Sequence, residues 1–320
     1  MKYTNLGKNG PSVSTVSFGA WGISGRDWGF TDDQVSKKAI HAALDNGVNL
    51  IDTADVYGFG HSEELIAQVL DERLDKNKII IATKAGNNFY PSLNEKHKIT
   101  PPNPDYSRKH IIFAAEQSLK RLKRDYLDIL QLHSPTTDIL LKDEPWEALL
   151  KLKEQGKILH AGLSVQSFKE TEQAFILDKH HDILSIIQVR YNLLEREAER
   201  ELFPKAQKNG IGVIVRIPLL FGLLTGKFRN DHTFDENDHR RNNLSIERLS
   251  AYLTRLDEMK LFFTKHAQYS MAQLSLRFCI SHPACHIAIP GAKTASQVVE
   301  NVKAAELDSI AHDEFPRLDS

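Results

Sequence analysis

Apolar stretches rich in β-branched residues alternate with segments of helical periodicity along most of the chain. This alternation is typical of repeated strand–helix units, which form a parallel sheet. The pattern predicts eight strands, at residues 15–18, 49–52, 79–84, 127–133, 158–164, 186–189, 212–217 and 287–289. Eight repeats close a barrel better than an open sheet, so the predicted fold is an α/β protein of the (β/α)8 TIM barrel type.

A helical segment follows each predicted strand. These segments lie at residues 32–46, 63–70, 108–122, 145–155, 169–178, 197–209, 246–282 with breaks, and 295–304. A chain of 320 residues is within the range of one such barrel, and no linker or low-complexity tract divides it. We therefore expect a single domain over residues 1–320.

Three segments lie outside the repeating pattern. The turn signal Gly7-Lys8-Asn9-Gly10-Pro11 predicts an N-terminal β-hairpin, placed where it could plug the bottom of the barrel. Residues 85–107 and 218–245 form connections far longer than is usual between such elements. Both follow the carboxyl ends of predicted strands, so we expect long loops at the C-terminal face, where active sites of this fold are built.

Charge and composition indicate which classes of molecule the protein binds and where in the cell it is expected. The formal net charge of -1 provides no global field to attract nucleic acid or an anionic membrane, which favours small-molecule partners. No apolar run approaches the roughly 20 residues that a membrane helix needs. The first residues lack the apolar core of a signal peptide, and the chain has only two cysteines, Cys279 and Cys285, so we expect a cytoplasmic protein.

Ionisable side chains stand at or just after the ends of three predicted strands. The stretch Asn49-Leu50-Ile51-Asp52-Thr53-Ala54-Asp55-Val56-Tyr57-Gly58 presents Asp52 and then Tyr57, the next strand ends in Lys84, and the fourth in His133. Carboxyl ends of parallel strands meet on one rim, so these four side chains are expected to converge. Taken singly, each residue also fits a structural role: Asp52 as a turn cap, Tyr57 as a packing residue, Lys84 as a surface charge and His133 as a core histidine. Packing alone would rarely place all four at strand ends in this pattern.

The four residues suit proton transfer to a carbonyl oxygen. If Tyr57 faces Lys84, the ammonium favours phenolate and lowers the tyrosine pKa from about 10, while Asp52 keeps the ammonium charged. Tyr57 can then donate a proton near neutral pH, and His133 can polarise a substrate oxygen through a hydrogen bond. The sequence offers no metal-binding cluster and no nucleophile beside a base. A hydride-carrying cofactor is the natural complement.

The same residues carry a resemblance to the aldo-keto reductase superfamily, which extends over almost the whole chain. Asp52-Thr53-Ala54-Asp55-Val56-Tyr57-Gly58, Lys84 and Gln131-Leu132-His133 match its catalytic Asp, Tyr, Lys and His in type and order. The resemblance implies a nicotinamide-dependent reductase of aldehydes or ketones on a (β/α)8 barrel. The cofactor residues that it implies are Trp21, Asp52, Ser164, Gln188, Arg216, Pro218, Leu219, Gly222, Lys227, Gly291, Lys293, Gln297, Glu300 and Asn301.

NADPH is the expected cofactor, with NADH as the alternative. The Gly291-Ala292 turn opens a helix near Thr294, whose free N–H groups and dipole favour an anion, and Lys293 adds a charge for phosphate. An ordinary capped surface helix with a solvated lysine is the other interpretation. Glu300 could bind a ribose diol and so favour NADH.

Two positions depart from the family pattern. Arg216 stands where many members have an aromatic that stacks on the nicotinamide, and Val165 where many have Asn. The planar guanidinium could stack in place of the aromatic, reach a phosphate, or be buried in an ion pair. Val165 lacks the side-chain amide that would hold the nicotinamide carboxamide in those members, so the resemblance implies a larger share of that binding for Ser164 and Gln188.

A substrate pocket is expected beside the catalytic set. Its predicted walls are Trp21, Tyr57, His133, Trp28 and Phe89, with Phe30 and Tyr90 as further candidates. Two other functions remain open. One is a cofactor-sensing binding subunit like the family members that accompany potassium channels, and the other is a barrel lyase that uses Lys84 as a Schiff-base nucleophile.

Overall fold

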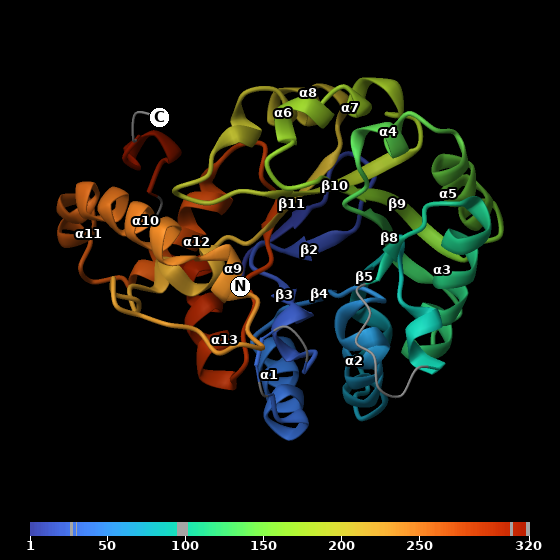
Figure 1. Ribbon diagram of the computed structural model, residues 1–320, viewed down its shortest axis with the longest axis horizontal. Coiled ribbons are helices and arrows are strands. Elements are labelled where there is room, and N and C mark those ends of the chain that lie inside the picture. The colour runs from blue at the N-terminus through green and yellow to red at the C-terminus, as the bar shows by residue number, and fades with distance from the viewer. Residues whose placement is uncertain (26–27, 30, 95–101, 308–309, 318–320) are drawn as a thin grey trace.

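The computed structural model describes residues 1–25, 28–29, 31–94, 102–307 and 310–317. Its main sheet has eight strands in the order β12-β11-β10-β9-β8-β5-β4-β3, and all neighbouring pairs are parallel. The sheet curls until its edges meet, where Val16 pairs with Ala288 and the Ser17 N–H donates to the Ala288 carbonyl at 2.9 Å (Figure 1). The strands are β3 (Phe18–Gly19), β4 (Leu50–Asp52), β5 (Ile80–Ala85), β8 (Leu127–His133), β9 (Ile158–Ser164), β10 (Leu184–Arg190), β11 (Gly212–Arg216) and β12 (Ile287–Ala288). The predicted (β/α)8 barrel is confirmed.

Most of the helices cover the outside of this sheet. The helices in the described residues are α1 (Asp33–Asp45), α2 (His61–Asp71), α3 (Arg108–Leu122), α4 (Thr137–Leu140), α5 (Glu144–Glu154), α6 (Glu170–Gln173), α7 (Ile176–Lys179), α8 (Leu202–Asn209), α9 (Arg240–Asn243), α10 (Ile246–Glu258), α11 (Lys260–Lys265), α12 (Met271–Ser281) and α13 (Ala295–Lys303). The predicted helix at 169–178 is instead two short helices, α6 and α7. No helix in the described ranges combines the length and apolar character that a membrane span requires.

Polar caps set where several of these helices begin. Asp32 accepts the Val35 N–H at the start of α1, and Ser107 does the same for His110 at the start of α3. A hydroxyl or carboxylate at this position satisfies an N–H group that has no partner within the helix. Thr294 caps α13 in this way, by accepting the Gln297 N–H at 3.3 Å. The turn before α13 is thereby fixed beside the end of β12.

The N-terminal hairpin closes the bottom of the barrel, as predicted. Its strands β1 (Tyr3–Asn5) and β2 (Ser12–Ser14) pair antiparallel. Leu6 and Val13 are fully buried and pack with the inward-facing side chains of the barrel strands. Gly7 has φ +74°, and a Cβ there would lie 2.4 Å from the Gly212 nitrogen, so the close approach of the hairpin to the start of β11 requires glycine.

Both long connections contain short elements. β6 (Asn87–Asn88) and β7 (Asn103–Pro104) pair antiparallel in the first, and the second contains the 3-10 segment Leu220–Thr225 followed by α9. A bridge between Trp28 and Asp238 joins the second connection to the loop after β3. Residues 218–245 therefore lie over the strand ends, on the face where the site residues were expected.

Candidate active site

Asp52, Lys84 and Tyr57 meet at the carboxyl ends of β4 and β5. The Lys84 Nζ donates to Asp52 Oδ2 at 2.6 Å and to the Thr53 carbonyl at 2.8 Å, and lies 3.5 Å from the Tyr57 hydroxyl. The Lys84 side chain is 1% exposed and that of Asp52 is 3% exposed. Desolvating two charges is costly unless they pair closely, and the 2.6 Å contact provides that pairing.

Two amides from the neighbouring strands hold the other oxygen of Asp52. Gln188 on β10 donates to Asp52 Oδ1 at 2.6 Å, and Gln131 on β8 donates to the same atom at 3.3 Å. Asp52 therefore accepts hydrogen bonds from three strands of the barrel. The carboxylate has one fixed orientation, and it fixes that of Lys84.

The net pKa of Tyr57 differs from the prediction. Burial raises this pKa above its usual value of 10.0, and the effect outweighs Lys84, which lowers the pKa as expected. The predicted net decrease is therefore wrong, because the sequence does not reveal how deeply the phenol is buried. Tyr57 remains protonated at neutral pH, as a proton donor must.

Lys84 and His133 have fixed charge states near neutral pH. For Lys84, burial lowers the pKa, but the charges of Asp52 and Tyr57 outweigh it and raise the net pKa above 10.5. For His133, burial lowers the pKa well below 6.5, and Lys84 and Arg216 lower it further. The imidazole of His133 is thus neutral, and its ring lies edge-on to Tyr57 with the centroids 5.8 Å apart. A neutral imidazole here can donate one hydrogen bond to a substrate oxygen.

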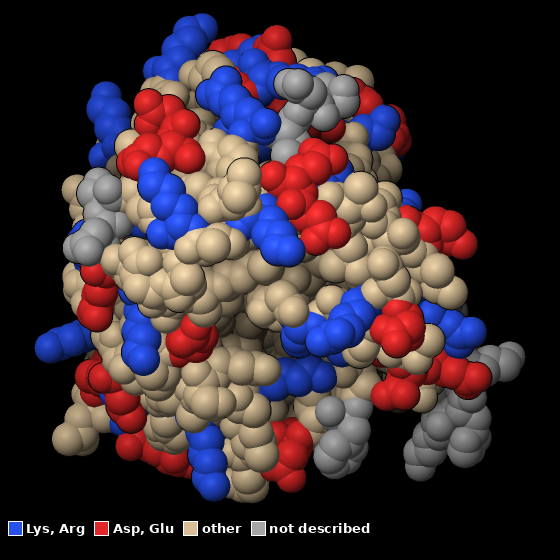
Figure 2. All heavy atoms as spheres, turned by 90° about the vertical axis from the view of Figure 1, so that its left-hand side faces the viewer, with Lys and Arg blue, Asp and Glu red and all other residues tan. Residues whose placement is uncertain are grey.

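A cavity of about 700 Å³ opens above these residues. Every cofactor residue predicted from the sequence lines it, as do Trp28, Tyr57 and His133, while Lys84 lies beneath them and contacts Tyr57. Figure 2 shows the face of the molecule on the side of α10 and α11, which is hollowed between tan side chains with Lys and Arg side chains nearby. The cavity is within the usual size range of small-molecule sites.

Three cations gather at the end of the cavity beside α13. Lys227, Arg240 and Lys293 all line this end, and Asp238 pairs with Arg240 at 2.9 and 3.1 Å. Burial lowers the pKa of Lys227 and of Lys293, and Arg240 lowers both further, because like charges repel. Three cations with one paired carboxylate fit a multiply charged anion such as a nucleotide phosphate. Arg240 was not predicted from the sequence, although it belongs to the long connection 218–245 that was expected at the active-site face.

Trp21, Trp28 and Tyr57 place aromatic rings in the wall of the cavity. Trp21 is stacked against Tyr57 at 5.9 Å and against His239 at 4.4 Å, and it meets Trp28 edge-on at 5.2 Å. His239 belongs to the long connection and was also missed from the sequence. Trp21 therefore packs against the Tyr57 ring on one side of the cavity.

Phe89 does not belong to this wall. Its side chain is fully buried and lies between Phe59 at 5.0 Å and Tyr90 at 4.2 Å, away from the residues that line the cavity. The prediction from its place after a strand end is corrected, because the chain turns there and packs the ring beneath the loop. The candidate Phe30 lies outside the described residues.

Arg216 is held by two neutral acceptors. Its Nη2 donates to the Val165 carbonyl and to Ser167 Oγ, both at 2.9 Å. It forms no ion pair with any carboxylate in the part of the chain that the structure describes, so the ion-pair interpretation of this residue is wrong. Its neighbour Arg190, in contrast, pairs with Glu195 through two nitrogens.

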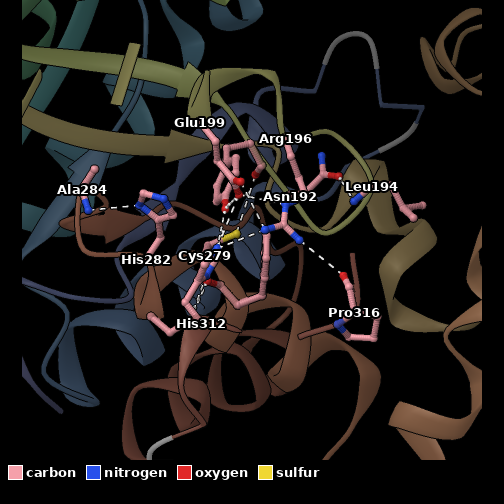
Figure 3. A network of polar contacts seen from close by, with 12 residues as sticks. Asn192, Leu194, Arg196, Glu199, Cys279, His282, Ala284, His312 and Pro316 are labelled. Atoms are coloured by element: carbon pink, nitrogen blue, oxygen red, sulfur yellow. Dashed lines mark hydrogen bonds and ion pairs between the residues drawn. The ribbon is translucent and has the colours of Figure 1, made fainter. Parts of the chain in front are cut away.

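A second polar cluster lies near the C-terminal end of the described chain (Figure 3). Ligand-type atoms of Glu199, His282 and His312 lie within 4.8 Å of one another, a spacing that a metal ion could bridge. Two contacts oppose this use. Arg196 donates to Glu199 at 2.8 and 3.2 Å, which places a cation in the site, and His282 Nδ1 accepts the Ala284 N–H, which leaves the proton on Nε2. We interpret the cluster as a structural attachment for residues 310–317.

Glu199→Gln is expected to lower the free energy of unfolding at pH 7 by about 1–3 kcal/mol, since charged hydrogen bonds from Arg196 are lost. Burial raises the pKa of Glu199, but hydrogen bonds from His312, Arg196 and Tyr191 outweigh it and lower the pKa to about 2. The stabilisation is therefore present above the unfolded pKa of about 4.3 and is lost as pH falls toward 2.

Urea unfolding at pH 7 and near pH 3 measures this difference. Glu201→Gln is the matched control, because Glu201 is exposed and lies 4.0 Å from Lys205. Equal stability of the Glu199 variant and the wild type at pH 7 would contradict the structural role.

Comparisons with known proteins cover nearly the whole chain. A model of the Aldo/keto reductase family matches residues 15–320. Aldo-keto reductase YhdN of Bacillus subtilis (strain 168) is 34% identical over 301 residues, which are 93% of this chain and 87% of that protein. A probable voltage-gated potassium channel subunit beta of Arabidopsis thaliana is 33% identical over 319 residues, 96% of this chain and 92% of the relative. The structure of the glycerol dehydrogenase AKR11B4 from Gluconobacter oxydans matches with a TM-score of 0.81 and 34% identity, covering 98% and 92% of the two chains.

These similarities agree with the site. The barrel, the strand-end set of Asp52, Lys84, Tyr57 and His133, and the residues that line the cavity all lie within the matched residues. They support an oxidoreductase that uses a nicotinamide cofactor. The chain belongs to the aldo/keto reductase family.

Proposed function

We propose that the protein is an NADP(H)-dependent carbonyl reductase in which Tyr57 donates the proton to the substrate oxygen. The observation that carries this proposal is the contact of the buried Lys84–Asp52 pair with the Tyr57 hydroxyl, at the floor of a cavity with three cations at its other end. An elongated molecule with a reactive ring at one end and phosphates at the other fits this arrangement. NADPH, when bound, supplies the hydride.

The residues of the chain supply everything else in the reaction. As negative charge develops on the carbonyl oxygen, Tyr57 transfers its proton there and becomes a phenolate. Lys84 stabilises that phenolate, and Asp52 keeps Lys84 charged. The neutral His133 donates a hydrogen bond to the same oxygen and orients the substrate. Tyr57 then recovers a proton from solvent, so one carbonyl becomes one alcohol.

The preference for NADPH rests on the cations near α13. Lys293 begins the turn before this helix, and its Nζ donates to the Trp28 carbonyl at 2.6 Å. Glu300 also lines the cavity and could accept from a ribose hydroxyl. Lys227, Arg240 and Lys293 outnumber this carboxylate, so a 2′-phosphate is favoured.

Lys293→Ala is expected to weaken NADPH binding about tenfold, equivalent to about 1.4 kcal/mol, and to change NADH binding little. The reason is that only NADPH carries the 2′-phosphate with which the ammonium can pair. Titration of both nucleotides by quenching of tryptophan fluorescence measures the two dissociation constants. Lys303→Ala, at the exposed end of the same helix, is the control, and equal losses for the two nucleotides would rule out a 2′-phosphate contact by Lys293.

A second candidate function is suggested by the relative named as a potassium channel subunit beta. The protein would then bind the nucleotide as a sensor and turn over slowly. Steady-state oxidation of NADPH with a panel of aldehydes separates the two functions. The lyase alternative is disfavoured, because the raised pKa of Lys84 and its bond to Asp52 leave a charged, poorly nucleophilic amine.

A further inference from the structure

We propose that Arg216 makes the cavity bind the reduced, uncharged nicotinamide ring more tightly than the oxidised, positively charged ring. This inference rests on the proposed function, because it assumes that a nicotinamide nucleotide enters the cavity. It assigns to Arg216 a role in selecting the redox state of the cofactor, separate from the contacts with phosphate.

Arg216 is fixed in place at the end of the barrel. It is the last residue of β11 and pairs in register with Arg190 on β10. Its guanidinium is tied through Nη2 to the Val165 carbonyl and to Ser167 Oγ, in the segment that follows β9. These two hydrogen bonds, together with the backbone pairing to β10, leave this planar group little freedom, so its charge stays where the structure places it.

The positive charge of Arg216 is poorly compensated. The other two buried cations near the reacting end have close carboxylates, Asp52 for Lys84 and Glu195 for Arg190. Arg216 has only the two neutral oxygens as acceptors, and its Nε has no hydrogen-bond partner among the described residues. Glu170 acts on it electrostatically, but burial raises the pKa of this carboxyl to about 7, so Glu170 is only partly ionised at neutral pH.

The reacting ring must lie close to this charge. Tyr57, His133 and Arg216 line the same cavity, so the charge of Arg216 faces the reacting end. In keeping with this, Arg216 lowers the pKa of both Tyr57 and His133. Hydride transfer needs the ring carbon about 3–3.5 Å from the carbonyl carbon, while Tyr57 must reach the carbonyl oxygen. The ring therefore occupies the space that these three side chains share.

A positive ring at this place is repelled, and a neutral ring is not. Between partly buried charges a few ångströms apart, this repulsion is large enough to change a dissociation constant about tenfold. The ratio of the NADP⁺ and NADPH dissociation constants is thus raised. NADPH is retained before reaction and NADP⁺ leaves readily after it, so Arg216 favours carbonyl reduction as the working direction.

The test is the ratio Kd(NADP⁺)/Kd(NADPH), measured by tryptophan fluorescence quenching at pH 7.5 for the wild type, Arg216→Gln, Arg216→Met and Arg216→Lys. Both neutral variants should lower the ratio about tenfold, and the Lys variant should keep it within about twofold. The NAD⁺ and NADH pair should show the same change, since the effect acts on the ring and not on the 2′-phosphate.

Three results of these measurements would contradict the inference or the proposed function. An unchanged ratio in the folded neutral variants, with both nucleotides weakened equally, would overturn the inference and assign Arg216 to a phosphate contact. A lowered ratio in the Lys variant would overturn the role of charge. A wild type that binds neither form of either nucleotide would contradict the proposed function itself, and the inference with it.

Discussion

Tyr57→Phe is expected to lower kcat for carbonyl reduction by about 10²–10⁴-fold and to leave the NADPH dissociation constant within about twofold of the wild type. The substitution removes the hydroxyl, which transfers the proton, and keeps the ring, which packs on Trp21 at 5.9 Å. Single-turnover oxidation of bound NADPH by an excess of aldehyde measures the chemical step. Fluorescence titration measures binding independently.

Tyr90→Phe is the matched control for this experiment. The Tyr90 hydroxyl accepts from Arg121 at 3.4 Å, and the residue is not among those that line the cavity. Its variant should reduce aldehydes within about twofold of the wild-type rate. A Tyr57→Phe enzyme that retains near wild-type kcat, with a substrate whose chemistry limits the rate, would remove Tyr57 from its assigned role.

Lys84→Met is expected to impair reduction severely and also to destabilise the fold. The change deletes the cation that stabilises the Tyr57 phenolate and leaves Asp52 buried without its ion-pair partner, which typically costs about 3–5 kcal/mol. The folded pKa of Lys84 is raised above its unfolded value near 10.5. In the wild type the stabilisation from Lys84 is therefore present throughout neutral pH and is lost only as pH rises above that value.

The double variant Lys84→Met, Asp52→Asn separates the two effects. Removing the charge of Asp52 should restore much of the stability without restoring the rate, as judged by urea unfolding and by kcat. A double variant that regains wild-type turnover would show that Lys84 matters only for folding.

The wild-type rate should stay nearly constant through neutral pH, since the pKa of His133 is well below 6.5 and that of Tyr57 is above 10.0.

The sequence was sufficient to predict the barrel and the rim because both depend on local patterns. The predicted segments at 127–133 and 108–122 coincide with β8 and α3, where apolar spacing and a serine cap mark the limits. Asp52, Lys84 and His133 meet because the carboxyl ends of parallel strands must lie on one edge. No knowledge of the side-chain packing was needed for these predictions.

What the sequence could not predict depends on packing between distant segments. Arg240 lines the cavity and His239 stacks on Trp21, and both belong to a long connection that has no periodicity, so nothing local indicates their direction. Phe89 follows a strand end as a pocket residue would, yet the turn after it buries the ring beneath the loop. The net pKa of Tyr57 depends on a balance between burial and Lys84, and only the structure provides the degree of burial.

The most direct test of the account is steady-state oxidation of NADPH by the wild-type protein with a panel of aldehydes and ketones, with analysis of the alcohol formed. Thermal shifts with NADPH and NADH, recorded beside it, report binding, because a ligand of the native state raises apparent stability. The account predicts a larger shift with NADPH and many turnovers per site, with one alcohol formed for each NADPH consumed. A shift with NADPH but no more than one turnover across the whole panel would contradict carbonyl reduction as the function of this site.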